Sequence, residues 1–296
     1  MPRDFARSRT LDSPIVVAQT VRSPPRPSDC VVFFTHLWDA RIASHFARLK
    51  REMEGILPVF LAVHLEPGAS LPAGLQPDIV VDGRLAMHLF PARFAACVGH
   101  RTGFKPGYVD LLWLAALLQP SLANFDRLWV MEYDVDFSGV WSRFFTEAAG
   151  YDADLLATHL RFRRDDLDWV WLNEIADPDD HPDDHIIGLL ALARLSRIAL
   201  SRLALSYRHD RWAGHFELII PTVISRLGLR VADLGGNGSF TDPSRRGRWY
   251  DGTSGLEHDP FGVGTPRSDY FAESPAGYAK GRLYHPVKPG WFSDAS

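Results

Sequence analysis

An apolar run that ends in three evenly spaced carboxylates constrains the fold of this chain more than any other feature. The stretch Arg127–Phe137 reads Arg-Leu-Trp-Val-Met-Glu-Tyr-Asp-Val-Asp-Phe. Its first part is continuously apolar, which is typical of a central parallel strand buried on both faces. If Leu128–Tyr133 is a strand and its alternation continues, then Glu132, Asp134 and Asp136 all point the same way. The sequence therefore predicts an acidic cluster at the carboxyl end of a central strand.

Three carboxylates this close repel one another, so either a pKa rises or a cation lies among them. Ligand sets made of oxygen atoms suit Mg²⁺ or Mn²⁺. Ligands of open α/β sheets collect at the carboxyl ends of strands, which favours this position. The alternative is a strand that runs into a solvated acidic turn. We expect a Mn²⁺ or Mg²⁺ site, and the sequence leaves open which two carboxylates bind the cation.

The chain before this stretch alternates between strand-like and helix-like segments. Short apolar runs predict strands at Cys30–Thr35, Pro58–His64 and Asp78–Val81, and apolar residues at helical spacing predict a helix over Ala40–Glu54. This order is typical of a Rossmann-like α/β fold with a mostly parallel sheet flanked by helices. Neither a Gly-x-Gly-x-x-Gly motif nor a P-loop follows the first strand, which argues against a dinucleotide dehydrogenase or a P-loop ATPase.

The remaining segments are assigned by the same patterns. Predicted helices cover Tyr108–Leu118, Ser138–Ala149, Ser196–His209 and Trp212–Leu227, and predicted strands cover Asp154–Thr158, Ile186–Leu192 and Leu229–Leu234. Ser138 is a suitable N-cap for its helix. The segment Arg84–His100 has a mixed pattern and stays unassigned, while Gly235–Lys280 reads as a long loop region.

Composition and charge limit the partners of the chain. It has 296 residues and a net charge of -4, with no stripe of Lys and Arg, so we expect no nucleic-acid partner. Its two cysteines, Cys30 and Cys97, indicate neither a disulfide framework nor a zinc site. No run approaches the roughly 18 to 20 apolar residues that cross a bilayer, and no signal peptide is apparent. We expect a cytoplasmic protein with no transmembrane segment. Residues 1–29, rich in Pro, Ser and Arg, predict a disordered tail that offers a peripheral membrane contact as the alternative.

The pattern resembles the GT-A class of nucleotide-sugar-dependent glycosyltransferases. The likeness rests on Asp134-Val-Asp136 after a mid-chain apolar strand, on the alternating strands and helices before it, and on His285 in Tyr-His-Pro-Val-Lys. The resemblance implies one GT-A-like domain over 30–288, in which 30–150 bind the nucleotide sugar and 151–288 bind the acceptor. It also implies a Mn²⁺ or Mg²⁺ ion that Asp134 and Asp136 hold against the donor diphosphate, with His285 as a further ligand. Glu132 is the alternative partner of Asp134.

The implied reaction moves a sugar from a nucleoside-diphosphate sugar to a hydroxyl of a glycan, a lipid-linked acceptor or a small molecule. The departing diphosphate gathers negative charge, which cationic groups stabilise. Candidate donor-binding residues lie at strand ends, in a turn before the helix Tyr108–Leu118 and near the C-terminus: Thr35, His36, Asp39, Asp82, Arg101, Lys105 and Lys288. For Lys105 the alternative is an ordinary solvated lysine in a loop.

An inverting transferase needs a base that takes the proton of the attacking hydroxyl. Glu217, next to His215 at a predicted helix start, is the first candidate, and Asp184 is the second. The alternative for Glu217 is a first-turn glutamate favoured by the helix dipole. We expect inversion, although a retaining enzyme needs no such base and the sequence does not decide the stereochemistry.

Two rival classes fit part of the pattern. Haloacid-dehalogenase-like phosphatases carry an Asp-x-Asp nucleophile motif after an apolar strand, and Asp134-Val-Asp-Phe-Ser138 resembles it, but that motif normally opens the fold. A non-catalytic carbohydrate-binding α/β protein would instead use loops such as the one with Trp169 and Trp171. In such a protein the carboxylates would not converge and His285 would lie far from Asp134.

Overall fold

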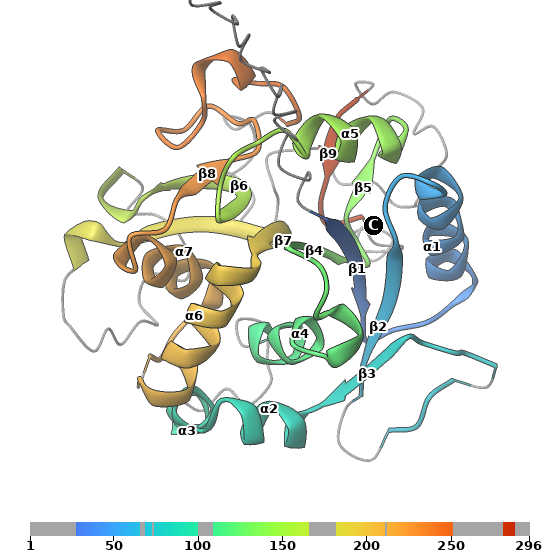
Figure 1. Cartoon of the computed structure of the whole chain (residues 1–296), viewed down its shortest axis with the longest axis horizontal. Helices are drawn as coiled ribbons and strands as arrows, with labels where there is room; N and C mark the ends of the chain where they lie inside the picture. The colour runs from blue at the N-terminus through green and yellow to red at the C-terminus, as the bar shows by residue number, and fades with distance from the viewer. Residues whose placement is uncertain are drawn as a thin grey trace, which may run out of the picture.

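A seven-stranded sheet forms the centre of the protein (Figure 1). The computed structural model describes residues 28–65, 69–72, 74–99, 109–165, 182–210, 212–250 and 281–287. In spatial order the strands are β3 (Ile79–Asp82), β2 (Val59–Leu65), β1 (Asp29–Thr35), β4 (Arg127–Glu132), β7 (Ile186–Ser196), β6 (Leu155–Phe162) and β8 (Val231–Asp233). Neighbours are parallel except at β7, which is antiparallel to β4 and β6. The predicted α/β class with a mostly parallel sheet is confirmed.

Strand order reverses between β1 and β4. From β1 the chain builds β2 and β3 on one side, and then returns to place β4 on the other side of β1. Ligands of open α/β sheets collect at the carboxyl ends of strands at such a reversal. Phe34 of β1 pairs with Glu132 of β4 at this end, and the amide of Tyr133 donates to the Phe34 carbonyl. The acidic stretch therefore begins where the strand order reverses.

Helices cover both faces of the sheet. The helices α1 (Ala40–Met53) and α5 (Trp141–Ala148) pack on one face, and the other carries α2 (Gly83–Leu89), α3 (Pro91–Gly99), α4 (Asp110–Leu117), α6 (Arg197–His209) and α7 (Phe216–Arg226) (Figure 1). Side chains alternate along β4 accordingly, since Trp129 packs with α5 and Val130 belongs to the opposite core. Each such buried side chain contributes about 1.5–3 kcal/mol to folding. This two-sided burial explains why β4 reads as a continuous apolar run.

The helices α1 and α2 each have an aspartate as their N-cap. Asp39 accepts hydrogen bonds from the amides of Arg41 and Ile42 at the start of α1. Asp82 accepts from the amide of Leu85 at the start of α2. An aspartate N-cap contributes about 1 kcal/mol to helix stability. Both carboxylates thus have a structural role that the sequence pattern did not indicate.

A two-stranded antiparallel sheet joins the middle of the chain to residues 281–287. It pairs β5 (Asp136–Phe137) with β9 (Leu283–Tyr284). Next to it, the amide of Val287 donates to the Asp134 carbonyl at 2.8 Å. Neither strand was predicted, because two residues carry no periodicity. This pairing delivers the C-terminal histidine to the end of β4.

Several boundaries differ from the sequence predictions. The unassigned segment Arg84–His100 contains α2 and α3, and β6 and β7 run longer than predicted. The helix predicted to start at Ser138 starts at Trp141, because the Ser138 hydroxyl donates to the carbonyl of Arg282 instead of capping a helix. Short 3₁₀ turns cover Pro120–Leu122, Arg163–Asp165, Pro182–Asp184 and Pro243–Arg245. In the described part of the chain no helix is long and apolar enough to cross a membrane.

Candidate metal centre

The first two carboxylates of the acidic stretch lie at the end of β4. The strand ends at Glu132, and the chain then turns, with the amide of Val135 donating to the Glu132 carbonyl at 3.1 Å. The turn places Asp134 under the C-terminal segment, so that its side chain is 3% exposed, against 23% for Glu132. One carboxylate is therefore buried, and the other reaches the surface.

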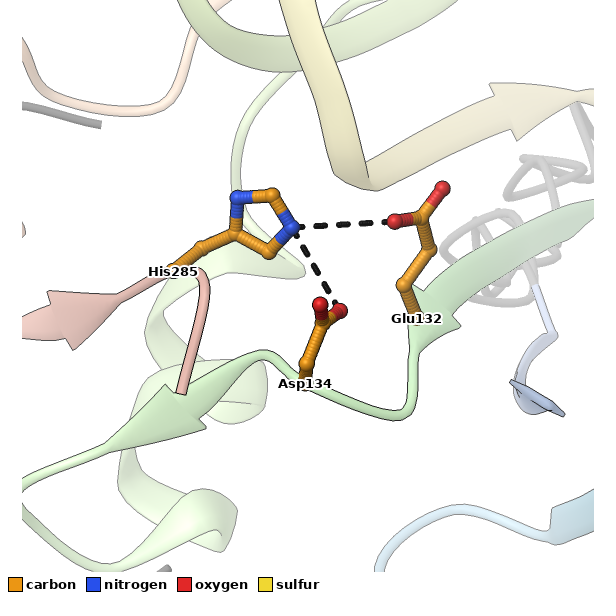
Figure 2. Close-up of side chains that lie close together, drawn as sticks. All are labelled: Glu132, Asp134 and His285. Carbon is orange, nitrogen blue, oxygen red and sulfur yellow. Dashed lines mark ion pairs between the residues drawn. The ribbon is translucent and has the colours of Figure 1, made fainter. Parts of the chain in front are cut away.

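His285 completes a three-residue cluster. Its Nε2 atom lies 3.4 Å from Oδ1 of Asp134 and 3.6 Å from Oε2 of Glu132. Figure 2 shows the three side chains pointing into one space, two of them from the end of β4 and one from the segment after β9. One ligand atom from each residue lies within 4.8 Å of the other two. Among the described residues this is the one group of three such side chains.

A proton on His285 offsets part of the negative charge of the cluster. Burial acts to lower the pKa of this imidazole, but the carboxylates of Asp134 and Glu132 outweigh it and raise the pKa to about 9. At neutral pH the histidine therefore carries one positive charge, which offsets one of the two carboxylates. A divalent cation fits the same role, since two carboxylate oxygens and an imidazole nitrogen are ligands that Mn²⁺ accepts and that Mg²⁺ accepts less readily.

The third carboxylate, Asp136, does not point into the cluster. Its Oδ1 atom lies 2.8 Å from Nη2 of Arg48 and accepts from the amide of Phe137. Burial raises the pKa of Asp136 to about 6, and Arg48 opposes this rise. The expectation that all three acids share one side is wrong, because strand alternation stops at Glu132 and the turn redirects the chain. The alternative of Glu132 with Asp134 is the arrangement that the structure shows.

Glu217 lies close to the cluster in a buried position. It is in the first turn of α7, where the amide of Leu190 donates to its Oε1 atom at 3.4 Å and Nδ1 of His215 lies 3.6 Å from its Oε2 atom. Burial raises the pKa of Glu217 to about 8, the charge of Glu132 adds to the rise, and His285 opposes it. The charges of two cluster members therefore act on Glu217, and its role as a base stays a prediction.

The second candidate, Asp184, is not part of this arrangement. It forms a two-point ion pair with Arg226 at the last turn of α7, and its side chain is 50% exposed. Glu217 lies nine residues before Arg226 on α7, and at 1.5 Å per residue this separates the two by roughly 13 Å along the helix. The structure therefore shows Asp184 in a surface ion pair and does not bring it to the cluster.

Aromatic and imidazole rings meet beside the cluster, at the carboxyl ends of three strands. The exposed ring of His36 stacks on His64 with 5.1 Å between centroids, and it meets the edge of Tyr133 at 5.3 Å. These residues come from the carboxyl ends of β1, β2 and β4. The neighbouring Thr35 is buried, and its hydroxyl donates to the Leu37 carbonyl. His36 is exposed, whereas Thr35 is buried.

Some sequence predictions fall outside the described residues. These are the basic residues Arg101, Lys105 and Lys288 and the tryptophans Trp169 and Trp171. Asp39 and Asp82 lie within the described residues as helix N-caps, and their carboxylates accept hydrogen bonds from backbone amides. The expected contact of these two residues with a nucleotide stays a prediction.

Two hollows of the described part of the chain bear on the location of the site. The larger, about 630 Å³, lies between the end of α1 and the start of β2, lined by residues such as Arg51 and Ile56. That is the amino end of β2, opposite the carboxyl edge that carries the cluster. The smaller, about 20 Å³, lies beside His285 between Thr158 and Tyr284 and has room for about one water molecule. Chemistry and strand order, rather than cavity size, identify the site.

Two buried polar residues that the sequence analysis did not single out bind backbone carbonyls near the cluster and before α7. On α1, Nε2 of His45 donates to the carbonyl of Val135 at 2.9 Å. On α3, Arg93 donates to the carbonyls of Trp212 and Gly214, just before the start of α7. For His45 a signal was present, since it lies at helical spacing between the buried Ile42 and Leu49.

Comparisons with known proteins give little. The chain matches no family model and no curated protein. Among solved structures it is similar to the mannosyltransferase Ktr4p from S. cerevisiae, at 9% identity and a TM-score of 0.29, over 71% of this chain and 70% of that one. A likeness this weak carries no argument, so the function rests on the site.

Proposed function

We propose that the protein is a cation-dependent glycosyltransferase that moves a sugar from a nucleoside-diphosphate sugar to a hydroxyl acceptor. The convergence of Glu132, Asp134 and His285 at the reversal of strand order carries this proposal. Glu132, Asp134 and His285 would hold Mn²⁺ or Mg²⁺. The ion would supply positive charge against a diphosphate that leaves the sugar.

The donor would lie across the carboxyl ends of β1 and β4. His36 lies at the surface with its ring against His64 and Tyr133, which supports a stacking position for a planar base. It follows β1 by one residue, and β1 pairs with β4 at Phe34 and Glu132. A nucleotide that stacks on His36 would thus bring its phosphates toward the cluster.

Glu217 would act on the acceptor hydroxyl. A base must be ionised, and the raised pKa of about 8 reflects burial in the absence of added positive charge. A cation nearby favours the carboxylate form. With Glu217 as base the reaction would invert the configuration at the sugar carbon, as the first candidate assignment expects.

The structure argues against the non-catalytic alternative. That reading required carboxylates that do not converge and a histidine far from Asp134, whereas 3.4 Å separate His285 from Asp134. The phosphatase alternative expects the Asp-x-Asp motif to open the fold, but in the described residues three strands and four α-helices precede β4, which leads into Asp134. The transferase therefore accounts for more of the site.

A thermal-shift panel tests the proposal. The protein is melted with Mn²⁺, with Mg²⁺ and with each common nucleoside diphosphate, alone and combined. We expect that one nucleotide raises the melting temperature only with the cation, and that its sugar conjugate is then consumed when acceptors are added. Hydrolysis of an aryl phosphate, or no response to any cation and nucleotide pair, would overturn the assignment.

A further inference from the structure

One face of α1 carries a row of polar side chains toward the chain that follows Asp134. His45, Arg48 and Glu52 are spaced at i, i+3 and i+7, so they share a side of the helix. His45 and Arg48 are only 2% and 5% exposed. Burying polar groups is unfavourable unless each finds a partner, so this row needs a reason.

Each of these three side chains contacts a successive part of the segment 135–141. His45 donates to the Val135 carbonyl at 2.9 Å. Arg48 donates to the Phe137 carbonyl at 2.8 Å, and to Asp136 at the same distance.

The row ends at the start of α5. Glu52 accepts from the amide of Trp141 at 2.8 Å and lies 3.4 Å from Nε of Arg48. Helix α1 thus contacts Val135, Asp136, Phe137 and Trp141 in order, along a stretch that begins where the turn after β4 ends. The opposite side of that turn is held by the C-terminal segment, through the Val287 amide and the β5–β9 pairing.

We propose that His45, Arg48 and Asp136 are positioning residues of the cation site, which fix the turn so that Asp134 faces Glu132 and His285, and that Asp136 acts through Arg48. This inference rests on the proposed cation site and names the residues that would keep its ligands in position. The second acid of the Asp-x-Asp triplet then acts as an anchor of the turn and does not touch the ion. The guanidinium of Arg48 ties that anchor to the Phe137 carbonyl, one residue further on.

The first test is Mn²⁺ affinity, measured by calorimetry on the full chain. His45→Leu, Arg48→Met and Asp136→Asn should each weaken binding about 10- to 100-fold, as loss of a supporting partner does in other metal sites. His45→Gln, whose amide reaches the position of Nε2, should stay within about threefold of the wild type. Unchanged affinity in both His45→Leu and Arg48→Met would overturn the proposal.

A double-mutant cycle separates an anchor from a ligand. If Asp136 acts through Arg48, the double variant Arg48→Met/Asp136→Asn should bind Mn²⁺ about as well as either single variant. If Asp136 were a ligand, its loss would be as severe as that of Asp134→Asn and would add to the loss from Arg48→Met. The additive result contradicts the inference.

Amide hydrogen exchange provides a readout without metal. In the cation-free protein, the amides of residues 135–138 should exchange faster in His45→Leu and Arg48→Met, while β1 and β4 keep their protection. If the wild type binds no divalent cation, the proposed function fails, and the exchange data still show whether α1 holds the turn. Equal exchange in wild type and variants would refute the positioning role itself.

Discussion

Nε2 of His285 lies 3.4 Å from Oδ1 of Asp134, although the two residues come from opposite halves of the sequence. The contact depends on two short antiparallel strands and one backbone hydrogen bond from Val287. It places the cluster at the carboxyl ends of the parallel strands β1 and β4, where the strand order reverses. The predictions that follow concern this cluster and the buried groups around it.

Removing a charge from the cluster should abolish cation binding without unfolding the protein. Asp134→Asn and His285→Asn should each lower Mn²⁺ affinity at least 100-fold, because each deletes one of three ligands. Asp184→Asn is the matched control, since that carboxylate pairs with Arg226 at the surface and should leave affinity and turnover unchanged. Calorimetry and circular dichroism on the three variants check this, and wild-type Mn²⁺ affinity in Asp134→Asn would rule out the site.

Cation binding should displace a proton from His285. Its pKa of about 9 means that the imidazole is protonated at neutral pH, while a metal ligand must be neutral. The apparent affinity for Mn²⁺ should therefore rise about tenfold per pH unit between about pH 6 and 8. Calorimetry in buffers with different heats of ionisation should show close to one proton released. A pH-independent affinity would show that His285 is not a ligand.

Glu217→Gln should stop turnover while donor and cation binding remain.

The variant also tests the burial of the carboxyl group. The folded-state pKa of about 8 lies above the ordinary value of 4.5, so the folded state prefers the protonated acid. Stability from this group is complete below about pH 4.5 and is lost as the pH rises through 8, at ~1.4 kcal/mol per unit. Urea melts at pH 5 and pH 8 should therefore show Glu217→Gln gaining on the wild type. A constant difference, or an active variant, would contradict one half of this prediction.

His64 should make the protein sensitive to acid. Burial lowers its pKa to about 4, with a smaller effect from His36, so the folded state keeps it neutral while the unfolded chain takes up a proton below about 6.5. The stability advantage of wild type over His64→Gln should shrink by about 2 kcal/mol between pH 7 and pH 5. His88→Gln, at an exposed helical position, serves as the control and should show no such change. Parallel urea curves at both pH values would refute the prediction.

Gly236 should not accept a side chain. A methyl group there would lie 2.2 Å from the hydroxyl of Tyr250, which donates to the buried Asp233. Gly236→Ala should cost about 1–3 kcal/mol of stability, as overpacking does. Combining it with Tyr250→Ala should cost less than the sum of the two single losses, because the ring and hydroxyl of Tyr250 that the methyl group would meet are both gone. Additive losses in urea unfolding would show that the crowding lies elsewhere.

The sequence predicted the first half of the fold well because local signals agree there. Cys30–Thr35 and Leu128–Met131 are apolar runs of strand length, and Ala40–Glu54 has a clear helical period closed by Gly55. The antiparallel direction of β7 is set by its neighbours in space, which an apolar run does not encode. The β5–β9 pairing lacks any period at all, since it consists of two residues on each side.

The candidate site shows where local reasoning ends. Glu132 and Asp134 follow from the end of a buried strand, and His285 follows from the family resemblance alone, because no spacing relates it to β4. Asp136 was placed wrongly because alternation was extended past the last residue of the strand. Arg48, its partner, looked like one more charge on an amphipathic helix, and only tertiary packing distinguishes it from the exposed Arg51.

The β5–β9 pairing also has a consequence for biosynthesis. A ribosome adds about 5–20 residues per second, so His285 is made roughly 8–30 s after Asp134. During that interval β1, β2, β3 and β4 can already assemble, whereas the two acids at the end of β4 lack the imidazole that offsets their charge. The nascent protein thus acquires these four strands first, and the proposed cation site is complete only after β9 and His285 have been made.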